Sequence, residues 1–248
     1  MLTETRFLVA DAHHQGTAIA PQDTSMMPLA SAQVAARGGY WDSYYAQGKT
    51  LVAPSQFATF VAAECPDHDL VVDIGCGNGR DALFFAHLGH RVIGIDGSQS
   101  AIDHCRSRLS THDESGSPHQ FLRSDVSDLS DESGLMARMD GCRKVLYSRF
   151  FLHAIHEAEE RAFFEFVDLA MRPRDTLALE FRTLEDEGRC KVTGAHYRRY
   201  IDSSRLVQSV LRDLGLHLQY WVEGTGYAKY RDDDAYVCRV LFTRPASC

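Results

Sequence analysis

One ten-residue stretch constrains the fold of this 248-residue chain more than any other. It reads VVDIGCGNGR over residues 71–80, an apolar strand that runs straight into a glycine-rich turn. Gly75 and Gly77 let the backbone turn sharply and approach a ligand more closely than a side chain would permit. A turn of this kind that leads into a helix presents backbone N–H groups to a bound molecule. The stretch therefore predicts a ligand-binding strand–helix unit.

Around this turn the chain alternates between short apolar segments and amphipathic segments with a helical period. Such alternation is typical of βαβ units and of a parallel sheet covered on both faces. The last two strands are joined without a helix, so they should pair antiparallel. We therefore predict an α/β fold with a doubly wound seven-stranded sheet, mostly parallel with an antiparallel C-terminal strand pair. Strands are expected over residues 70–74, 91–95, 120–123, 144–147, 176–181, 216–222 and 235–243, and helices over 80–88, 100–109, 157–171 and 203–214, from Pro54 onward and, weakly, near Leu135.

The length suits one large domain, which we assign to residues 31–248. Residues 1–30 show no sustained period and are rich in small and polar residues, so they are predicted to form a mobile N-terminal arm. The polar stretch at about 183–201, after the fifth strand, is predicted to be an insertion beside the binding site.

Composition excludes several classes of protein. The 26 Lys and Arg against 34 Asp and Glu give a net charge of −8, which argues against nucleic acid or an anionic membrane as the main partner. No apolar run reaches the 18 residues of a membrane span, and the N-terminus lacks a secretory pattern. The seven cysteines show no zinc-ligand spacing, so we expect no metal and a cytoplasmic location.

Two carboxylates flank the glycine turn. Asp73 comes just before it, and a pyrophosphate would be repelled there, whereas an ammonium or a sulfonium would be attracted. Asp96 ends the second strand, where an acidic group is placed to accept hydrogen bonds from ribose hydroxyls. The glycine spacing is GxGxG rather than the GxGxxG of dinucleotide enzymes. Together these features favour a nucleoside ligand that carries a positive charge.

The stretch VVDIGCGNGR followed by RVIGIDGSQSAI resembles the first two motifs of the class I S-adenosylmethionine-dependent methyltransferases, over roughly residues 55–180. The resemblance implies a Rossmann-like fold, S-adenosylmethionine as cofactor and S-adenosylhomocysteine as product. It places Asp125 against the adenine, although a surface aspartate that caps a turn is the alternative. The upstream aromatic residues, Tyr45 among them, belong either to the core or to a lid over the cofactor. The implied cofactor-binding residues are Tyr45, Asp73, Gly75, Cys76, Gly77, Asp96, Gly97, Ser98, Asp125, Val126 and Ser148.

The acceptor should lie beyond the ends of the fourth and fifth strands, because ligands of doubly wound folds bind outside the carboxyl ends. His153 is the candidate general base there, although toward an acceptor that is already anionic it would be a hydrogen-bond donor. Arg149 is the second candidate catalytic residue. Arginine supplies 22 of the 26 basic residues, so some of these side chains are expected simply to be solvated. The candidate substrate-binding residues are Arg182, His196, Tyr197, Arg198 and Arg199, which could converge on one anionic group.

The predicted function is O-methylation of a small anionic (phosphate or carboxylate) or sugar-derived metabolite. The tail HYRRYI…GTGYAKYRDDDAYVCRVLF faintly resembles methyltransferases of bacterial surface-polysaccharide and phosphonate-type pathways. The alternatives are N-methylation, methylation of a neutral natural-product hydroxyl, and a non-catalytic S-adenosylmethionine-binding partner subunit. No Asn/Asp-Pro-Pro-aromatic tetrapeptide follows the fourth strand, which disfavours a base-methylating enzyme. The expected partner is therefore a small-molecule or saccharide-linked acceptor, and a homodimer is left open.

Overall fold

A computed structural model describes residues 39–47, 53–110, 119–130, 134–189, 191 and 196–246. The predicted N-terminal arm at 1–30 and part of the predicted insertion at 183–201 lie outside these residues. No helix within the described ranges has the length and apolar composition needed to cross a bilayer.

Within the described chain, seven strands form one sheet in the order β3-β2-β1-β4-β5-β7-β6. All neighbours pair parallel except at β7, which runs antiparallel to both β5 and β6. The predicted fold class is confirmed, including the antiparallel C-terminal pair. The strands are β1 (Leu70–Ile74), β2 (Arg91–Asp96), β3 (Gln120–Arg123), β4 (Lys144–Arg149), β5 (Thr176–Arg182), β6 (His217–Gly224) and β7 (Val237–Thr243).

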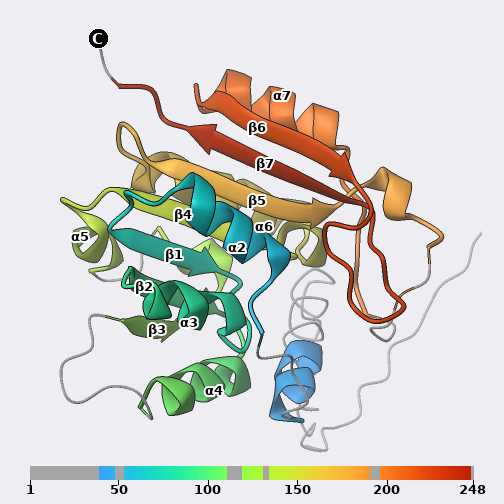
Figure 1. Ribbon diagram of the computed structural model, residues 1–248, viewed down its shortest axis with the longest axis horizontal. Helices are drawn as coiled ribbons and strands as arrows, with labels where there is room; N and C mark the ends of the chain where they lie inside the picture. Colours follow the sequence, from blue (N-terminus) through green and yellow to red (C-terminus); the bar gives the residue numbers. More distant parts are fainter. Residues whose placement is uncertain are drawn as a thin grey trace, which may run out of the picture.

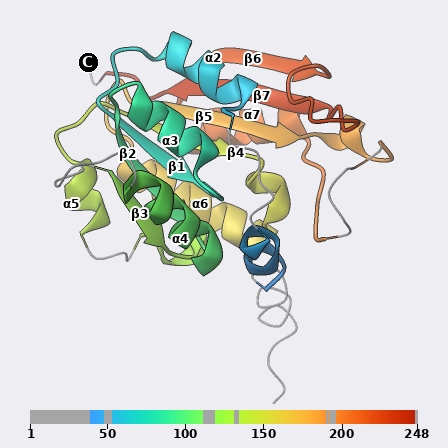
Figure 2. The same ribbon diagram turned by 60° about the horizontal axis from the view of Figure 1, so that its bottom comes forward.

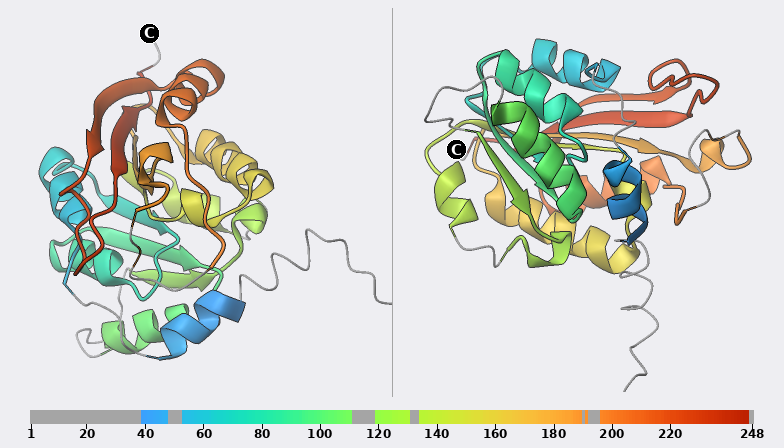
Figure 3. Two further views of the ribbon diagram at one scale, coloured as in Figure 1. Left: turned by 90° about the vertical axis from the view of Figure 1, so that its right-hand side faces the viewer. Right: turned by 90° about the horizontal axis from the view of Figure 1, so that it is seen from below.

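Helices cover both faces of the sheet (Figure 1). One face carries α2, α3 and α4, whose apolar residues pack with Val71 and Val92. The other carries α5, α6 and α7, which pack with Val72 and Leu179. Figure 3 shows these two helical layers on opposite sides of the strands. The helices are α2 (Gln56–Glu64), α3 (Arg80–His87), α4 (Gln99–Ser110), α5 (Leu135–Met139), α6 (Glu157–Ala170) and α7 (Ser203–Asp213).

The central strands are buried along their whole length, as expected of parallel strands covered on both faces. Pairing with neighbouring strands extends β4 and β5 beyond their predicted ends at 147 and 181. Arg149 pairs in register with Glu180, and Arg182 pairs with Val237. Both arginines therefore lie on the last residues of strands rather than in the loops that follow.

The segments that leave the carboxyl ends of the parallel strands gather at one end of the molecule. They include the short 3-10 turns Val126–Asp128, Leu152–Ala154 and Leu184–Asp186. The loop between β6 and β7 reaches the same end, as Figure 2 shows. A helix over residues 39–46, called the aromatic helix below, also lies there, beside the start of α4.

Candidate active site

A cavity of about 290 Å³ opens at the carboxyl ends of the strands. Its two ends differ in character. The end over β1 and β2 is lined by the glycine turn and by carboxylates, including Asp73 and Asp96. The end over β4 and β5 is lined by Arg149, His153 and Arg182. The fold thus brings both predicted groups of site residues to one cavity.

The glycine turn adopts the backbone conformation that its sequence predicts. Gly75 has φ +78° and Gly77 has φ +53°, in the left-handed region that favours glycine. A Cβ at Gly75 would lie 2.5 Å from the ring of Phe151. A Cβ at Gly77 would meet the hydroxyl of Tyr45. Phe151 and Tyr45 therefore pack tightly against the turn, and an alanine at Gly75 or Gly77 would force these contacts apart.

Asp96 fixes the turn from the neighbouring strand. Its Oδ2 accepts the N–H of Gly77 at 2.9 Å, and its Oδ1 accepts the N–H of Ser98 at 2.9 Å. A carboxylate oxygen can accept more than one hydrogen bond. Asp96 is thus placed for the predicted ribose role and also holds the backbone around it, with Gly97 and Ser98 alongside.

Asp73 is the most deeply placed carboxylate at this end, with 2% of its surface exposed. Burial raises its pKa well above the ordinary value, and the nearby charges of Asp81 and Asp96 raise it further. Desolvated carboxylates in close proximity repel one another unless a cation lies between them. The arrangement therefore favours a positively charged ligand at this position.

Asp81 is a site residue that the sequence reasoning missed. It lies in the first turn of α3 and is held by Ser55, whose N–H and hydroxyl donate at 2.7 and 2.8 Å. The hydroxyl of Tyr147 donates to it as well, at 2.9 Å. An acidic residue directly after a glycine turn was the available signal, but its partners are 26 and 66 residues away and sequence spacing does not reveal them.

The aromatic helix covers the cofactor end of the cavity. Trp41, Tyr44 and Tyr45 all contribute to the cavity wall, which supports the lid interpretation. The helix is fastened to α4, because Asp42 Oδ1 accepts the N–H of Ser100 at 2.8 Å and the hydroxyl of Ser98 at 2.9 Å. These bonds hold the aromatic helix against the start of α4.

The predicted cofactor residues after β3 and on β4 differ in their placement. Asp125 and Val126 line the cavity, as the adenine prediction requires. Ser148, by contrast, is 2% exposed and donates its hydroxyl to the carbonyl of Ile74 at 2.9 Å. It ties β4 to β1 and is not part of the cavity wall.

The residues present fit S-adenosylmethionine. The glycine turn lines the cavity without side chains at Gly75 and Gly77, and the desolvated carboxylate of Asp73 matches the positive charges of the cofactor. Asp96 stands at the end of β2 for the ribose, and Val126 offers an apolar surface for the base. Cys76 also lines the cavity, and burial raises the pKa of its thiol well above the ordinary value, so it is no nucleophile.

Arg182 is not an exposed side chain that waits for an anionic substrate. Its guanidinium is buried and pairs with Asp186 and Asp233, each at 2.6 Å. Lys191 adds a second cation to Asp186 at 2.9 Å. These contacts join the end of β5, the segment after it and the β6–β7 loop. Arg182 therefore lines the cavity while fastening the loops that form its wall.

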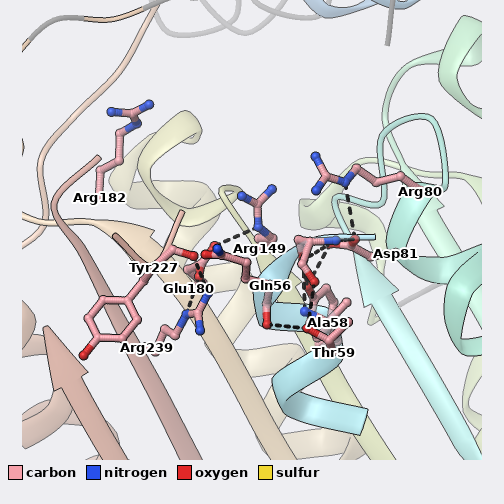
Figure 4. Close-up of polar contacts among 12 residues, drawn as sticks. Gln56, Ala58, Thr59, Arg80, Asp81, Arg149, Glu180, Arg182, Tyr227 and Arg239 are labelled. Carbon is pink, nitrogen blue, oxygen red and sulfur yellow. Dashed lines mark hydrogen bonds and ion pairs between the residues drawn. The ribbon is translucent and has the colours of Figure 1, made fainter. Parts of the chain in front are cut away.

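Arg149 is also ion-paired, through its Nε. Its Nε donates to Glu180 at 2.7 Å, and the other oxygen of Glu180 accepts Arg239 Nε at 2.6 Å. Figure 4 shows the distal nitrogens of Arg149 directed away from Glu180. Phe150 supports the guanidinium, with its ring centre 4.2 Å from the central carbon. Arg149 thus presents a planar set of donors on the cavity wall.

His153 lies between these arginines and is 4% exposed. Its ring packs edge-on against Phe150, and its Nδ1 accepts the backbone N–H of Arg182 at 3.3 Å. Burial lowers the pKa of the imidazole well below the ordinary value, and the positive charges of Arg182 and Arg198 lower it further. The ring is therefore neutral at physiological pH.

The remaining substrate candidates separate in the structure. His196 and Arg198 line the cavity, and Arg198 donates to His196 Nε2 at 3.2 Å. His196 also stacks on Tyr40 of the aromatic helix, with ring centres 4.8 Å apart. Tyr197 instead packs on His156 outside the cavity wall, and Arg199 turns to Glu160 and the carbonyl of Leu152. The structure thus brings together Arg149, His153, Arg182, His196 and Arg198, without Tyr197 and Arg199.

Comparison with known proteins gives one family match. A family model described as a methyltransferase domain matches residues 71–173, which span the glycine turn, β4 and α6. No curated protein matches the sequence.

Several solved structures are similar in fold. The 1,6-didemethyltoxoflavin-N1-methyltransferase of Burkholderia thailandensis is 16% identical, with a TM-score of 0.63 over 92% of this chain and 95% of that one. The magnesium protoporphyrin IX methyltransferase of Synechocystis is 16% identical, with a TM-score of 0.54 over 89% and 86%. A glycopeptide N-methyltransferase is 16% identical, with a TM-score of 0.59 over 78% and 97%. At this identity the likeness concerns the fold.

Proposed function

We propose that this chain, whose residues 71–173 match a methyltransferase domain, is a class I S-adenosylmethionine-dependent methyltransferase that methylates an oxygen of a small anionic or sugar-derived metabolite. The observation that carries the proposal is the composition of the cavity. Carboxylates line the end over β1 and β2, while Arg149, Arg182 and Arg198 line the end over β4 and β5. A cationic cofactor suits the first end and an anionic acceptor suits the second.

At the cofactor end, the chain's own residues bind and orient. Asp73 attracts positive charge, Asp96 accepts from the ribose, and Asp125 with Val126 bounds the base. The aromatic helix excludes water from above. When bound, S-adenosylmethionine supplies a methyl group on a positively charged sulfur, and alignment with desolvation accounts for most of the catalysis of its transfer.

At the acceptor end, Arg149 is the main candidate for holding the substrate, since its distal nitrogens face away from Glu180. A guanidinium can bind a carboxylate or phosphate through two parallel hydrogen bonds. Arg198 and His196 extend the same wall. We assign Arg182 to holding the wall in place, because both of its ion pairs are internal.

N-methylation is the second candidate. Two of the fold relatives are described as N-methyltransferases, one acting on 1,6-didemethyltoxoflavin and one on glycopeptides. The basic wall favours oxygen here, because an amine that gains a methyl group becomes positively charged beside guanidinium groups.

A screen of phosphorylated, carboxylated, neutral-sugar and amine acceptors tests the proposal. S-adenosylhomocysteine release gives turnover, and NMR of the product gives the methylated atom. We expect release with a phosphate- or carboxylate-bearing acceptor and a methyl ester as product. Turnover confined to amines, or to neutral hydroxyls outside sugars, would refute the proposed acceptor class.

Cofactor binding is tested separately with Asp96→Ala. The variant should bind S-adenosylmethionine about 1–3 kcal/mol more weakly, the scale of a lost charge-assisted hydrogen-bonding group. Asp128→Ala, an exposed carboxylate outside the cavity wall, is the matched control. Equal affinities of the two variants by calorimetry would rule out the ribose assignment.

We also propose a cytoplasmic location. The described cysteines, Cys65, Cys76, Cys105, Cys142 and Cys238, are free thiols, as is usual for proteins of a reducing compartment. Fractionation of producing cells tests this location.

A further inference from the structure

The backbone of β5 holds the imidazole of His153 in one tautomer. The N–H of Arg182 points at Nδ1, 3.3 Å away. A backbone amide nitrogen can only donate, so Nδ1 is the unprotonated acceptor and the neutral ring carries its proton on Nε2. The carbonyl of His153 accepts the N–H of Arg199 at 2.9 Å, which fixes the residue from the opposite side. The ring therefore has no free lone pair with which to take a proton.

The charges around His153 oppose a second proton on the ring. Arg182 on β5, Arg149 on β4 and Arg198 after β5 surround it with positive charge, and the ring of His196 lies beside Arg198. Nearby carboxylates already accept from guanidinium groups: Asp233 from Arg182 at 2.6 Å, and Glu180 from Arg149 and Arg239. Both oxygens of Glu180 and the Oδ2 of Asp233 are thus occupied as acceptors for N–H groups of the protein.

From this geometry we infer that His153 donates a hydrogen bond to the acceptor through Nε2–H, and that the acceptor atom enters as an oxyanion of the carboxylate or phosphate class. The inference rests on the proposed function and narrows it, since it excludes a neutral sugar hydroxyl. Arg149 and His153 form the two donors of this oxyanion site.

The chemistry of an oxyanion matches a site without a base. A lone pair of the oxyanion forms the new C–O bond while the C–S bond breaks, its electrons remaining on sulfur. No proton leaves the acceptor, and one positive and one negative charge cancel. Cancelling opposite charges is favourable in a desolvated site. An alcohol would instead have to lose a proton, and Nδ1 is already occupied by Arg182.

NMR of the histidine rings tests the tautomer without any acceptor. Uniformly ¹⁵N-labelled protein is loaded with S-adenosylhomocysteine, and His153→Gln identifies the His153 signals by their disappearance. We expect a protonated Nε2 and an unprotonated Nδ1 between about pH 6 and pH 8. A proton on Nδ1, or titration of the ring within this range, would overturn the inference.

Anion probes test the donor role in the same samples. Sodium acetate and inorganic phosphate should each shift the Nε2–H resonance, whereas glucose should not. A response to acetate alone or to phosphate alone identifies which oxyanion the site prefers. A shift with glucose and none with either anion would contradict an oxyanion site.

Side-chain replacement then separates a donor from a base. His153→Gln keeps an N–H donor and an oxygen that can accept the N–H of Arg182, whereas His153→Phe has neither. With the best acceptor of the screen, we expect the glutamine variant to stay within about tenfold of wild type and the phenylalanine variant to lose about a hundredfold. A loss of roughly a hundred- to ten-thousand-fold in the glutamine variant, with a changed pH profile, would make His153 a base after all.

Measuring the cofactor affinity of these variants distinguishes a failure of the proposed function from a failure of the inference about His153. His153→Gln should bind S-adenosylmethionine as the wild type does, because His153 lies at the acceptor end. Failure of the wild type to bind S-adenosylmethionine would defeat the proposed function. Normal binding together with an Nδ1-protonated ring would defeat only the inference about His153.

Discussion

Asp73 shows how a single residue can serve binding at the expense of folding. Its carboxylate is buried beside Asp81 and Asp96, so the folded chain holds its negative charge at a cost. A bound cationic ligand neutralises this repulsion. Relief of the unfavourable electrostatic energy of the ligand-free site therefore adds to the binding free energy. Such strain at a binding site is a common origin of the trade-off between stability and activity.

Asp73→Asn should therefore stabilise the ligand-free protein at neutral pH while weakening S-adenosylmethionine binding. The pKa of Asp73 is raised in the folded state, so lowering the pH through that value protonates the folded chain first. Wild-type stability then rises toward that of the variant, and wild-type affinity falls. Thermal unfolding and calorimetry across this pH range check both effects. An asparagine variant that is less stable than wild type at neutral pH would contradict this account.

Arg182→Ala should destabilise the protein by about 3–5 kcal/mol, because it removes the guanidinium that pairs with the buried carboxylates of both Asp186 and Asp233 and leaves only Lys191 paired with Asp186. Urea unfolding measures the loss. Arg212→Ala is the control, since its pair with Asp213 is exposed to solvent and should contribute little to stability. A loss as small as that of the control would mean that Arg182 is available for substrate.

Among the elements, the aromatic helix depends on α4 for its position. Asp42 accepts the N–H of Ser100 and so satisfies a backbone donor at the start of a helix that lies far away in sequence. His104 of α4 approaches the carbonyl of Tyr45, with 3.0 Å between Nε2 and the oxygen. The cover over the cofactor end is thus attached through three contacts to α4 and to Ser98 just before it.

Asp42→Ala should cost about 0.5–2 kcal/mol of stability, the usual value of a helix cap, and should also weaken S-adenosylmethionine binding. The affinity falls because the aromatic helix loses one of its attachments. Calorimetry measures the affinity, and Trp41 fluorescence in a Trp221→Phe background reports the position of the helix. Asp103→Ala, on the exposed side of α4, should change neither. If the variant is less stable but binds S-adenosylmethionine as tightly as wild type, Asp42 only caps α4 and does not act in cofactor binding.

At the scale of the whole molecule, the sequence predicts the fold class. The mostly parallel sheet follows from the alternation of strands and helices, and one local motif predicts that Asp73, Gly75 and Asp96 lie together, as they do on the cavity wall. The acceptor end is less predictable, because its electrostatics depend on contacts between distant residues. Arg182 meets Asp233 51 residues later, and no spacing rule connects them. The sequence reveals the guanidinium groups but not the carboxylates that some of them already bind.

The double ion pair of Arg182 also bears on how this enzyme can change during evolution. It fastens the segment after β5 and the β6–β7 loop to each other, and both lie outside the residues 71–173 that match the methyltransferase domain. Substitutions in these two loops, which Arg182 holds together, can then change the substrate preference while the cofactor-binding residues stay the same. When the two loops are exchanged between related enzymes, a chimera that receives both loops together with Arg182 should accordingly fold and be active. A chimera that receives only one of the loops should not.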